Sequence, residues 1–151
     1  MTNDRPQSGG ERSETHSATL PRDAILRGRN AFTAVFNCGS GVRSGRLVVK
    51  YRVTPSTNRT LVAGFVMRRG TGNAVRRNRL KRLMREAYRH ERREFESRLP
   101  DGLDVQLVVL WNGTPTEAAH ERVDRLGTDL VGAFRKILHR LRQQLVDGTG
   151  Q

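Results

Sequence analysis

The sequence of 151 residues contains a single cysteine, Cys38, which excludes any disulfide within the chain. A chain of this length can bury a core without disulfides, so one domain in a reducing compartment is the simpler expectation. The sequence also lacks an apolar run near the roughly 18 residues of a membrane span. Its first ten residues, MTNDRPQSGG, are polar, unlike the apolar core of a signal peptide. We expect a soluble cytoplasmic protein with no membrane partner.

Acidic residues are scarce beside basic ones, with 15 Asp and Glu against 28 Lys and Arg and a formal net charge of +13. Residues 1–19 and residues 146–151 each carry a net charge of −1, so the excess lies between them. We predict a disordered tail over residues 1–19, a folded domain over residues 20–145 and a disordered tail over residues 146–151. A folded surface this basic indicates a polyanion partner, and nucleic acid is the commonest.

The sequence has no convincing arrangement of residues for catalysis or for metal binding. It offers no nucleophile with a base and an orienting acid, and no paired carboxylates. Gly70-Thr71-Gly72 lacks the spacing of a Walker phosphate loop and the Lys-Ser or Lys-Thr that would follow it. The four histidines show no metal-ligand spacing with Cys38. We therefore expect no catalytic residue, no protein-bound metal and no tightly bound cofactor.

The most informative segment is GNAVRRNRLKRLMREAYRHERR, residues 72–93, which separates into two unlike faces at helical spacing. Apolar residues recur every three or four positions as a core-facing stripe, namely Leu80, Leu83, Met84, Ala87 and Tyr88. The opposite side carries Asn78, Lys81, Arg82, Arg85, Arg89 and Arg92. The segment is therefore expected to be a helix that packs on one side and is basic on the other.

The basic side of this helix is not arranged like a solvated surface. Nine cations lie between Arg76 and Arg93, and only Glu86 and Glu91 oppose them. Solvated faces usually mix their signs, whereas like charges four residues apart each cost about 0.2 to 0.5 kcal/mol at low salt. Cations in the first turn also oppose the helix dipole. The pattern favours an anionic partner that removes this repulsion over simple solvation.

The remaining elements predict an α+β domain. A short helix contains Phe32 and Phe36 and stops at Gly39. Residues 46–53 and 61–68 read as an antiparallel hairpin, and residues 104–111 read as a central strand. A final helix opens at Pro115, inside the capping box Thr114–Glu117, and runs to residue 145 with weak points at its glycines. Its leucine stripe is expected to be core rather than a dimer interface. The helices should cover one sheet face and leave the other partly open.

The run RRGTGNAVRRNRLKRLMREAYR, from Arg68 to Arg89, closely resembles the signature of the protein subunit of bacterial ribonuclease P. The hallmark of that family is an Arg-Asn-Arg helix preceded by Gly-Asn-Ala-Val, and residues 77–79 carry it here. The pattern FxxxFxxG of that family corresponds to Phe32, Phe36 and Gly39. The resemblance covers about residues 26–142.

This resemblance implies a small mixed sheet of about four strands with three helices and a left-handed strand-helix-strand crossover, against the usual right-handed rule. It implies that the partners are a catalytic RNA subunit and the 5′ leader of precursor tRNA, with no protein partner. The RNA subunit, using Mg²⁺, would hydrolyse the bond that frees the leader. The protein would assist this endoribonuclease by binding the RNA and the leader, without performing the chemistry.

The resemblance also assigns roles by position. Contact with the RNA subunit is implied for Arg68, Arg69, Asn73, Arg76, Arg77, Asn78, Arg79, Lys81, Arg82, Arg85 and Arg89. A cleft for the single-stranded leader is implied at Phe32, Phe36, Val48 and Lys50. From spacing alone, the two phenylalanines would be ordinary core residues. The sequence departs from the family pattern at Gly70, where Lys is usual, at Thr71, where an aliphatic residue is usual, and at Lys50, a position often apolar or aromatic.

Two other functions share these features. A structural RNA-binding protein of ribosomal type would have the same charge and α+β character, and it would not promote leader cleavage. A DNA-binding domain could place the arginine-rich helix in the major groove, and it would bind duplex DNA with sequence preference. The ribonuclease P function is the prediction carried forward.

Overall fold

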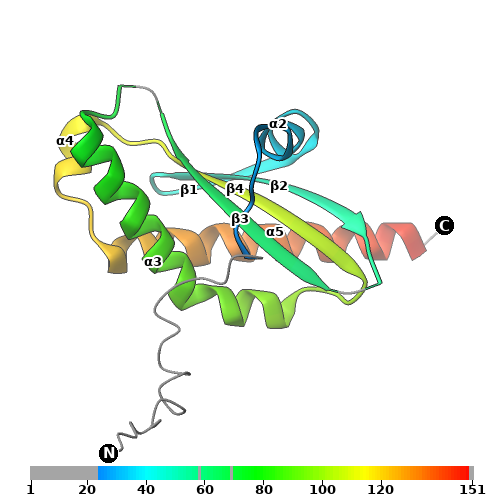
Figure 1. Ribbon diagram of the computed structural model, residues 1–151. Helices are drawn as coiled ribbons and strands as arrows, with labels where there is room; N and C mark the ends of the chain where they lie inside the picture. The colour runs from blue at the N-terminus through cyan, green and yellow to red at the C-terminus, as the bar shows by residue number, and fades with distance from the viewer. Residues whose placement is uncertain (1–23, 58, 69, 150–151) are drawn as a thin grey trace, which may run out of the picture.

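The computed structural model describes residues 24–57, 59–68 and 70–149, and the predicted tail over residues 1–19 lies outside them. The described residues form an α+β fold with helices on both sides of one sheet (Figure 1). Its helices are α2 (Arg29–Cys38), α3 (Ala74–Arg98), α4 (Pro115–Ala119) and α5 (Val123–Thr149). Its strands are β1 (Ser40–Ser44), β2 (Leu47–Pro55), β3 (Thr60–Met67) and β4 (Leu103–Trp111). None of the helices in the described ranges combines the length and the apolar character of a membrane span.

The sheet has four strands in the order β1-β2-β4-β3, and β4 lies inside it, as predicted. The predicted hairpin of β2 with β3 is wrong, because β4 lies between the two strands. β2 pairs antiparallel to β1 and to β4, whereas β3 pairs parallel to β4. Since β4 is the most apolar strand, a place with a neighbour on each edge buries it best. The two parallel strands are joined through α3, as the expected crossover requires, and its left hand stays a prediction.

The fourth strand, β1, could not be placed from the sequence because SGVRS has little strand propensity. It forms a hairpin with β2 in which Ser44 pairs with Leu47 across the two-residue turn Gly45-Arg46. Gly45 has a φ of 58°, which glycine adopts readily at the first position of such a turn. The turn rests on α5, where the carboxylate of Asp129 accepts a hydrogen bond from the Arg46 amide at 3.2 Å.

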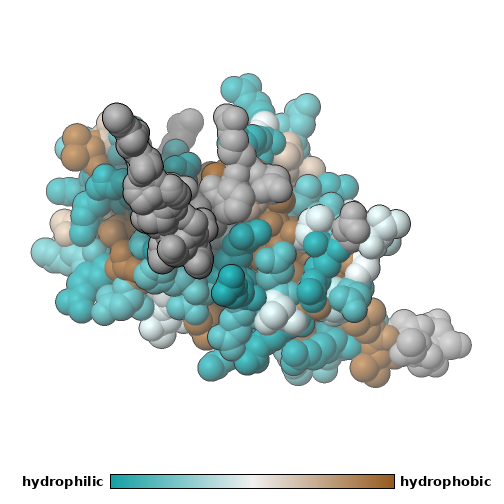
Figure 2. Space-filling model, turned by 60° about the horizontal axis from the view of Figure 1, so that its bottom comes forward, coloured by the Kyte–Doolittle hydropathy of each residue, from teal (hydrophilic) through white to brown (hydrophobic). Residues whose placement is uncertain are grey.

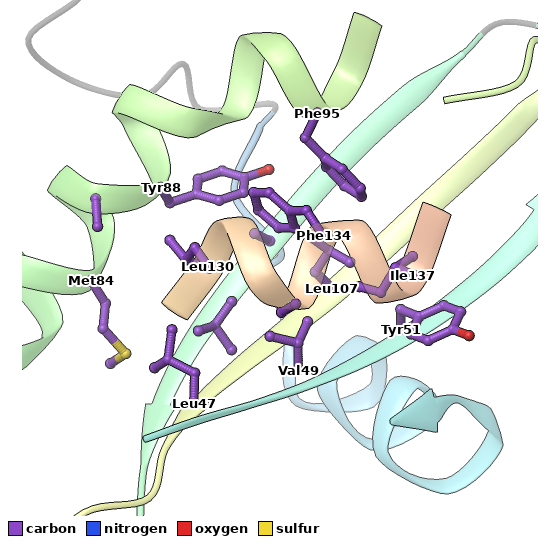
Figure 3. Close-up of a cluster of buried hydrophobic side chains, with 14 of the residues drawn as sticks. Leu47, Val49, Tyr51, Met84, Tyr88, Phe95, Leu107, Leu130, Phe134 and Ile137 are labelled. Carbon is purple, nitrogen blue, oxygen red and sulfur yellow. The ribbon is translucent and has the colours of Figure 1, made fainter. Parts of the chain in front are cut away.

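One side of the sheet packs against α3 and α5 and forms the main core. The predicted stripe of α3 is confirmed: Leu80, Met84, Ala87 and Tyr88 are buried, and Leu83 packs at the margin. The Tyr88 ring meets Phe65 of β3 and Phe134 of α5 edge-on, with ring centroids 5.5 and 6.3 Å apart. Phe134 also stacks on Phe95 at 4.0 Å (Figure 3). This packing fixes the rotation of α3 and turns its basic side away from the sheet.

The opposite side of the sheet, here called the α2 side, carries a smaller core. Val35 of α2 is fully buried and packs with Leu26 and with Val108 of β4. Gly39 allows the end of α2 to approach β2, because a Cβ there would lie 2.4 Å from the carbonyl oxygen of Tyr51. One short helix covers only part of a four-stranded sheet, so the α2 side is partly open, as the sequence predicts.

The predicted last helix is in fact two helices, so the described residues contain four helices rather than three. The capping box Thr114–Glu117 is present and begins α4. α4 ends at Ala119, because Glu121 turns its side chain into the core and accepts a hydrogen bond from Trp111 Nε1 at 2.9 Å. A buried carboxylate needs hydrogen-bond partners, and turning Glu121 toward them ends the helix at this point.

α5 is longer and more regular than predicted. It runs to Thr149, which corrects the predicted disordered tail for residues 146–149; no proline interrupts the backbone hydrogen bonds there. The expected weak points at Gly127 and Gly132 lie in continuous helix. A Cβ on Gly132 would lie 2.4 Å from Ser44 Oγ, so this glycine lets α5 lie close against β1.

Candidate nucleic-acid interface

The turn between β3 and α3 explains two departures from the family pattern. Gly70 has a φ of 82°, a conformation that lysine adopts only with strain. Thr71 is 2% exposed, and its hydroxyl donates to the carbonyl of Arg68, so a buried polar residue is satisfied where an aliphatic one is usual. Asn73 then caps α3, since its side chain accepts a hydrogen bond from the Arg76 amide at 2.9 Å. The start of α3 is therefore fixed without a lysine in the turn.

The outward side of α3 holds a group of side chains that have no partner in the residues that the structure describes. Asn78, Arg82 and Arg85 are exposed and Lys81 is half-buried. Within the described part of the chain, the side chains of these four residues make no hydrogen bond and no ion pair. We call this group, Asn78, Lys81, Arg82 and Arg85, the α3 patch. Arg85 lies three residues from Arg82 and four from Lys81, so their charges reinforce one another on one surface.

Three more of the predicted residues lie near the β3–α3 turn. Arg68 is exposed, and its NH1 donates to Asn112 Oδ1 at 3.3 Å. Arg77 is exposed and donates to the carbonyl of Gly72 at 2.7 Å, while Arg76 lies half-buried over the same glycine. Arg69 lies outside the described residues. The structure therefore places Arg68, Arg76 and Arg77 at the amino-terminal end of the α3 patch.

Arg79 points toward the protein itself. Its NH1 donates to the carbonyl of Ala118 at 3.1 Å, and its NH2 donates to the carbonyl of Glu121 at 2.9 Å. Both acceptors belong to fully buried residues at the break between α4 and α5. Arg79 therefore braces this corner, and it differs in that respect from its neighbours Asn78 and Arg82.

Arg89 is partly neutralised by its own helix. Its guanidinium donates to Glu86 at 2.6 and 3.2 Å, and His90 lies 3.1 Å from the same carboxylate. The hydrogen bond from Arg89 lowers the pKa of Glu86. The cationic field of α3 is thus strongest at the α3 patch and weaker toward Arg89.

A buried ion cluster around Glu121, which sequence reasoning missed, lies beneath Arg79 of α3, whose NH2 donates to the Glu121 carbonyl. The Glu121 carboxylate is fully buried and pairs with Arg125 at 2.9 Å and Arg46 at 3.2 Å, besides its bond with Trp111. Burial opposes ionisation of Glu121, but the hydrogen bonds from these groups outweigh it and lower the pKa of Glu121. Two of the three partners, Arg46 and Trp111, lie outside the helix of Arg125, so the cluster as a whole leaves no local signal in the sequence. The one local hint is the position of Glu121, an acidic residue shortly after the helix that begins at the capping box Thr114–Glu117.

The four residues of the predicted leader cleft all belong to the α2 side. Phe32 packs over β3, where a Cβ on Gly64 would lie 2.3 Å from its ring, and it contributes to the small core. Phe36 keeps 37% of its surface exposed. Val48 and Lys50 are half-buried alternate residues of β2. Only Phe32 therefore has a clear packing role, and the other three leave area accessible.

Within the described residues, no group of three or more His, Cys, Asp or Glu side chains could hold a metal ion. Hydrophilic residues cover most of the side seen in Figure 2, and hydrophobic ones come through in small separate areas. This surface is typical of a protein that binds a charged partner rather than a large apolar one.

Comparison with known proteins gives one consistent result. Residues 20–142 match the family model described as Ribonuclease P. A ribonuclease P protein component from Chlorobium phaeobacteroides is 32% identical over 112 residues, covering 67% of this chain and 77% of that protein. Another, from Pseudanabaena sp., is 32% identical over 80% of this chain and 97% of its own length. The solved RNase P protein from Thermotoga maritima has a TM-score of 0.58 at 26% identity, covering 74% of this chain and 96% of that one. On this evidence the chain belongs to the ribonuclease P protein family.

Proposed function

We propose that this chain, as the RNA-binding subunit of ribonuclease P, binds the catalytic RNA subunit through the α3 patch and the single-stranded 5′ leader across the α2 side. The holoenzyme is an endoribonuclease that removes the 5′ leader from precursor tRNA, and its chemistry belongs to the RNA. The protein contributes affinity and orientation. The observation that carries the proposal is the α3 patch, which is charged, largely exposed and without a partner among the described residues.

The contact with the RNA subunit follows from the charges of α3. The helix keeps cations side by side at a cost that its own carboxylates do not remove. Of the nine cations from Arg76 to Arg93, only Arg89 and Arg92 form an ion pair with a glutamate of α3 in the described structure. An RNA backbone would neutralise the remaining charges and release its counterions. Guanidinium groups suit this role because their planar fork matches two phosphate oxygens.

The leader would lie along the α2 side between α2 and β2. Phe36 offers an accessible ring for stacking, and Lys50 and Arg52 of β2 add charges on the same side of the sheet. Arg52 is held in place because its NH1 donates to Gln106 Oε1 at 3.3 Å. Aromatic rings beside a cationic track are the usual means of binding a single strand without sequence preference. With Lys50 in place of an apolar residue, this cleft would depend more on charge than on stacking.

Mg²⁺ would serve the RNA-containing holoenzyme rather than this chain alone. The described residues provide no group of three or more carboxylate, histidine or cysteine side chains, so we assign no metal ligand among them. Arg68 would instead approach phosphates near the RNA site where the metal acts, as was expected for it together with Arg69. The protein would improve metal use indirectly, by neutralising phosphates that compete for it.

The test compares Arg82→Ala with Arg142→Ala, since both remove one exposed cation that no carboxylate pairs with among the described residues. Arg82→Ala should weaken binding to the RNA subunit and lower the slope of log K against log salt by about 0.7 to 0.9. Arg142→Ala should change neither quantity. Leader cleavage at low Mg²⁺ is the second measurement. If the wild-type chain gives no gain in cleavage with a ribonuclease P RNA, the proposed function fails.

A further inference from the structure

The outer edge of the sheet carries cations from two distant parts of the chain. β1 is the end strand, and α5 reaches it from the main-core side. Lys136 Nζ donates to the carbonyl of Arg43 at 2.5 Å, and Arg140 NH1 donates to the carbonyl of Gly41 at 2.8 Å. Both cations are exposed, as is Arg43. We call Arg43, Lys136 and Arg140 the β1-edge cations.

These cations continue the proposed leader cleft without a gap in the strand register. Val48 and Lys50, the two cleft residues on β2, pair with Arg43 and Gly41 of β1. Those are the two residues whose carbonyls hold Lys136 and Arg140. Val48 is therefore paired with the β1 residue that binds Lys136, and Lys50 with the β1 residue that binds Arg140.

The side chain of Lys50 extends in the same direction. A Cβ on Gly41 would lie 3.4 Å from Lys50 Cδ and 3.8 Å from its Nζ, so the side chain lies across β1 rather than toward α2. Because Gly41 has no side chain, nothing projects from β1 at that point. Lys50, the Gly41 backbone and Arg140 thus form a shallow cationic path from the α2 side to the edge.

The charge on this path is not balanced by the protein. Residues 130–146 contain four basic residues and no acidic one. Among the described residues, no carboxylate forms an ion pair with Lys50 or with any β1-edge cation. Lys136 and Arg140 are also held by their bonds to backbone carbonyls, so less side-chain entropy is lost when an anion binds.

We propose that the 5′ leader does not end its contact in the cleft but continues over β1, where the β1-edge cations bind the phosphates of its distal nucleotides. This inference rests on the proposed function, because it extends the leader cleft. Contact through phosphates predicts dependence on leader length and salt, without dependence on leader sequence. Short leaders would not reach the edge.

The test uses the double variant Lys136→Ala/Arg140→Ala in the reconstituted holoenzyme. Its matched control is Arg135→Ala/Arg142→Ala, which removes the same charge from the same helix. Arg135 and Arg142 are exposed, lie seven residues apart and share another face of α5. Precursor tRNAs would carry leaders of about 4 and about 16 nucleotides, the range of site sizes found for single-strand-binding folds.

The edge variant should bind the long-leader substrate about tenfold more weakly, with a salt slope lower by about 1.4, as expected for two lost phosphate contacts. Its affinity for the short-leader substrate and for the RNA subunit should equal that of the control variant. Equal loss with both leaders, or loss of RNA-subunit binding, would overturn the inference and assign these cations to the RNA subunit. No loss with either leader would also overturn it, and would leave Lys136 and Arg140 as caps of an edge strand. Failure of the proposed function is seen separately, as absent stimulation by the wild-type chain.

Discussion

Arg79 and Arg82 lie one helical turn apart on α3, and replacing each with alanine should have unlike effects. Arg79→Ala removes two charge-assisted hydrogen bonds, to the carbonyls of Ala118 and Glu121. Both of these residues are fully buried, with 0% relative exposure, so water can hardly replace the guanidinium as a donor to their carbonyls. A hydrogen bond to a charged group contributes about 1.5 to 3 kcal/mol; because Arg79 is itself half-exposed, we expect a total loss of about 1 to 3 kcal/mol.

That loss should lower Tm by about 4 to 12 °C for a domain of this size. Arg82→Ala removes no hydrogen bond or ion pair within the described protein, so its free energy of unfolding should stay within about 0.5 kcal/mol of wild type. Thermal unfolding followed by circular dichroism measures both variants, and Arg79→Lys should fall between, since one ammonium cannot fork to two carbonyls as the guanidinium does. Equal Tm values for Arg79→Ala and Arg82→Ala would refute the bracing role of Arg79. The salt slope of RNA binding, measured beside Tm, tests the prediction that Arg79 also contacts RNA.

Three further predictions concern the buried cluster and the α2 side. The pKa of Glu121 is held below its usual 4.5, so ionised Glu121 stabilises the fold above that pH and this contribution is lost as pH falls through the lowered pKa. Glu121→Gln should therefore reduce the free energy of unfolding by about 3 kcal/mol near pH 7 and by less at about pH 3. Urea unfolding of wild type and variant at the two pH values measures both losses. Equal losses would contradict the prediction. Gly64→Ala places a methyl group 2.3 Å from the Phe32 ring and should cost about 1 to 3 kcal/mol, and Phe32→Leu in the same chain should restore part of it if that contact is the cause. Phe36→Ala should leave Tm nearly unchanged and weaken binding of leader-bearing precursor by about 1 to 3 kcal/mol relative to mature tRNA. If the variant keeps the wild-type ratio of the two affinities, Phe36 does not belong to the cleft.

Periodic patterns were the most reliable guide to the fold. The stripe from Leu80 to Tyr88 is buried as its spacing predicts, because a long amphipathic helix has only one way to face a sheet. β4 lies inside the sheet because its apolar run needs cover on both edges. The capping box at Thr114 marks a helix start through local chemistry alone.

The features that the sequence did not predict depend on partners far along the chain. The pairing of β2 with β4 rather than β3 was settled by which strand most needed burial, and no turn signal encodes that choice. The break before α5 follows from Glu121, whose partners Arg46 and Trp111 lie in the β1–β2 turn and at the end of β4. Likewise, Arg79 belongs to a basic motif by sequence but turns inward because two buried carbonyls lie within its reach.

The α3 patch also has a consequence for the protein before it meets RNA. Dissolved ions screen the crowded cations, so raising ionic strength should stabilise the free chain while it weakens the complex. Salt would then act with opposite sign on the two forms of one molecule. At low ionic strength, copies of the protein without RNA would be less stable than copies in the complex. The supply of RNA would then set how much of the protein stays folded.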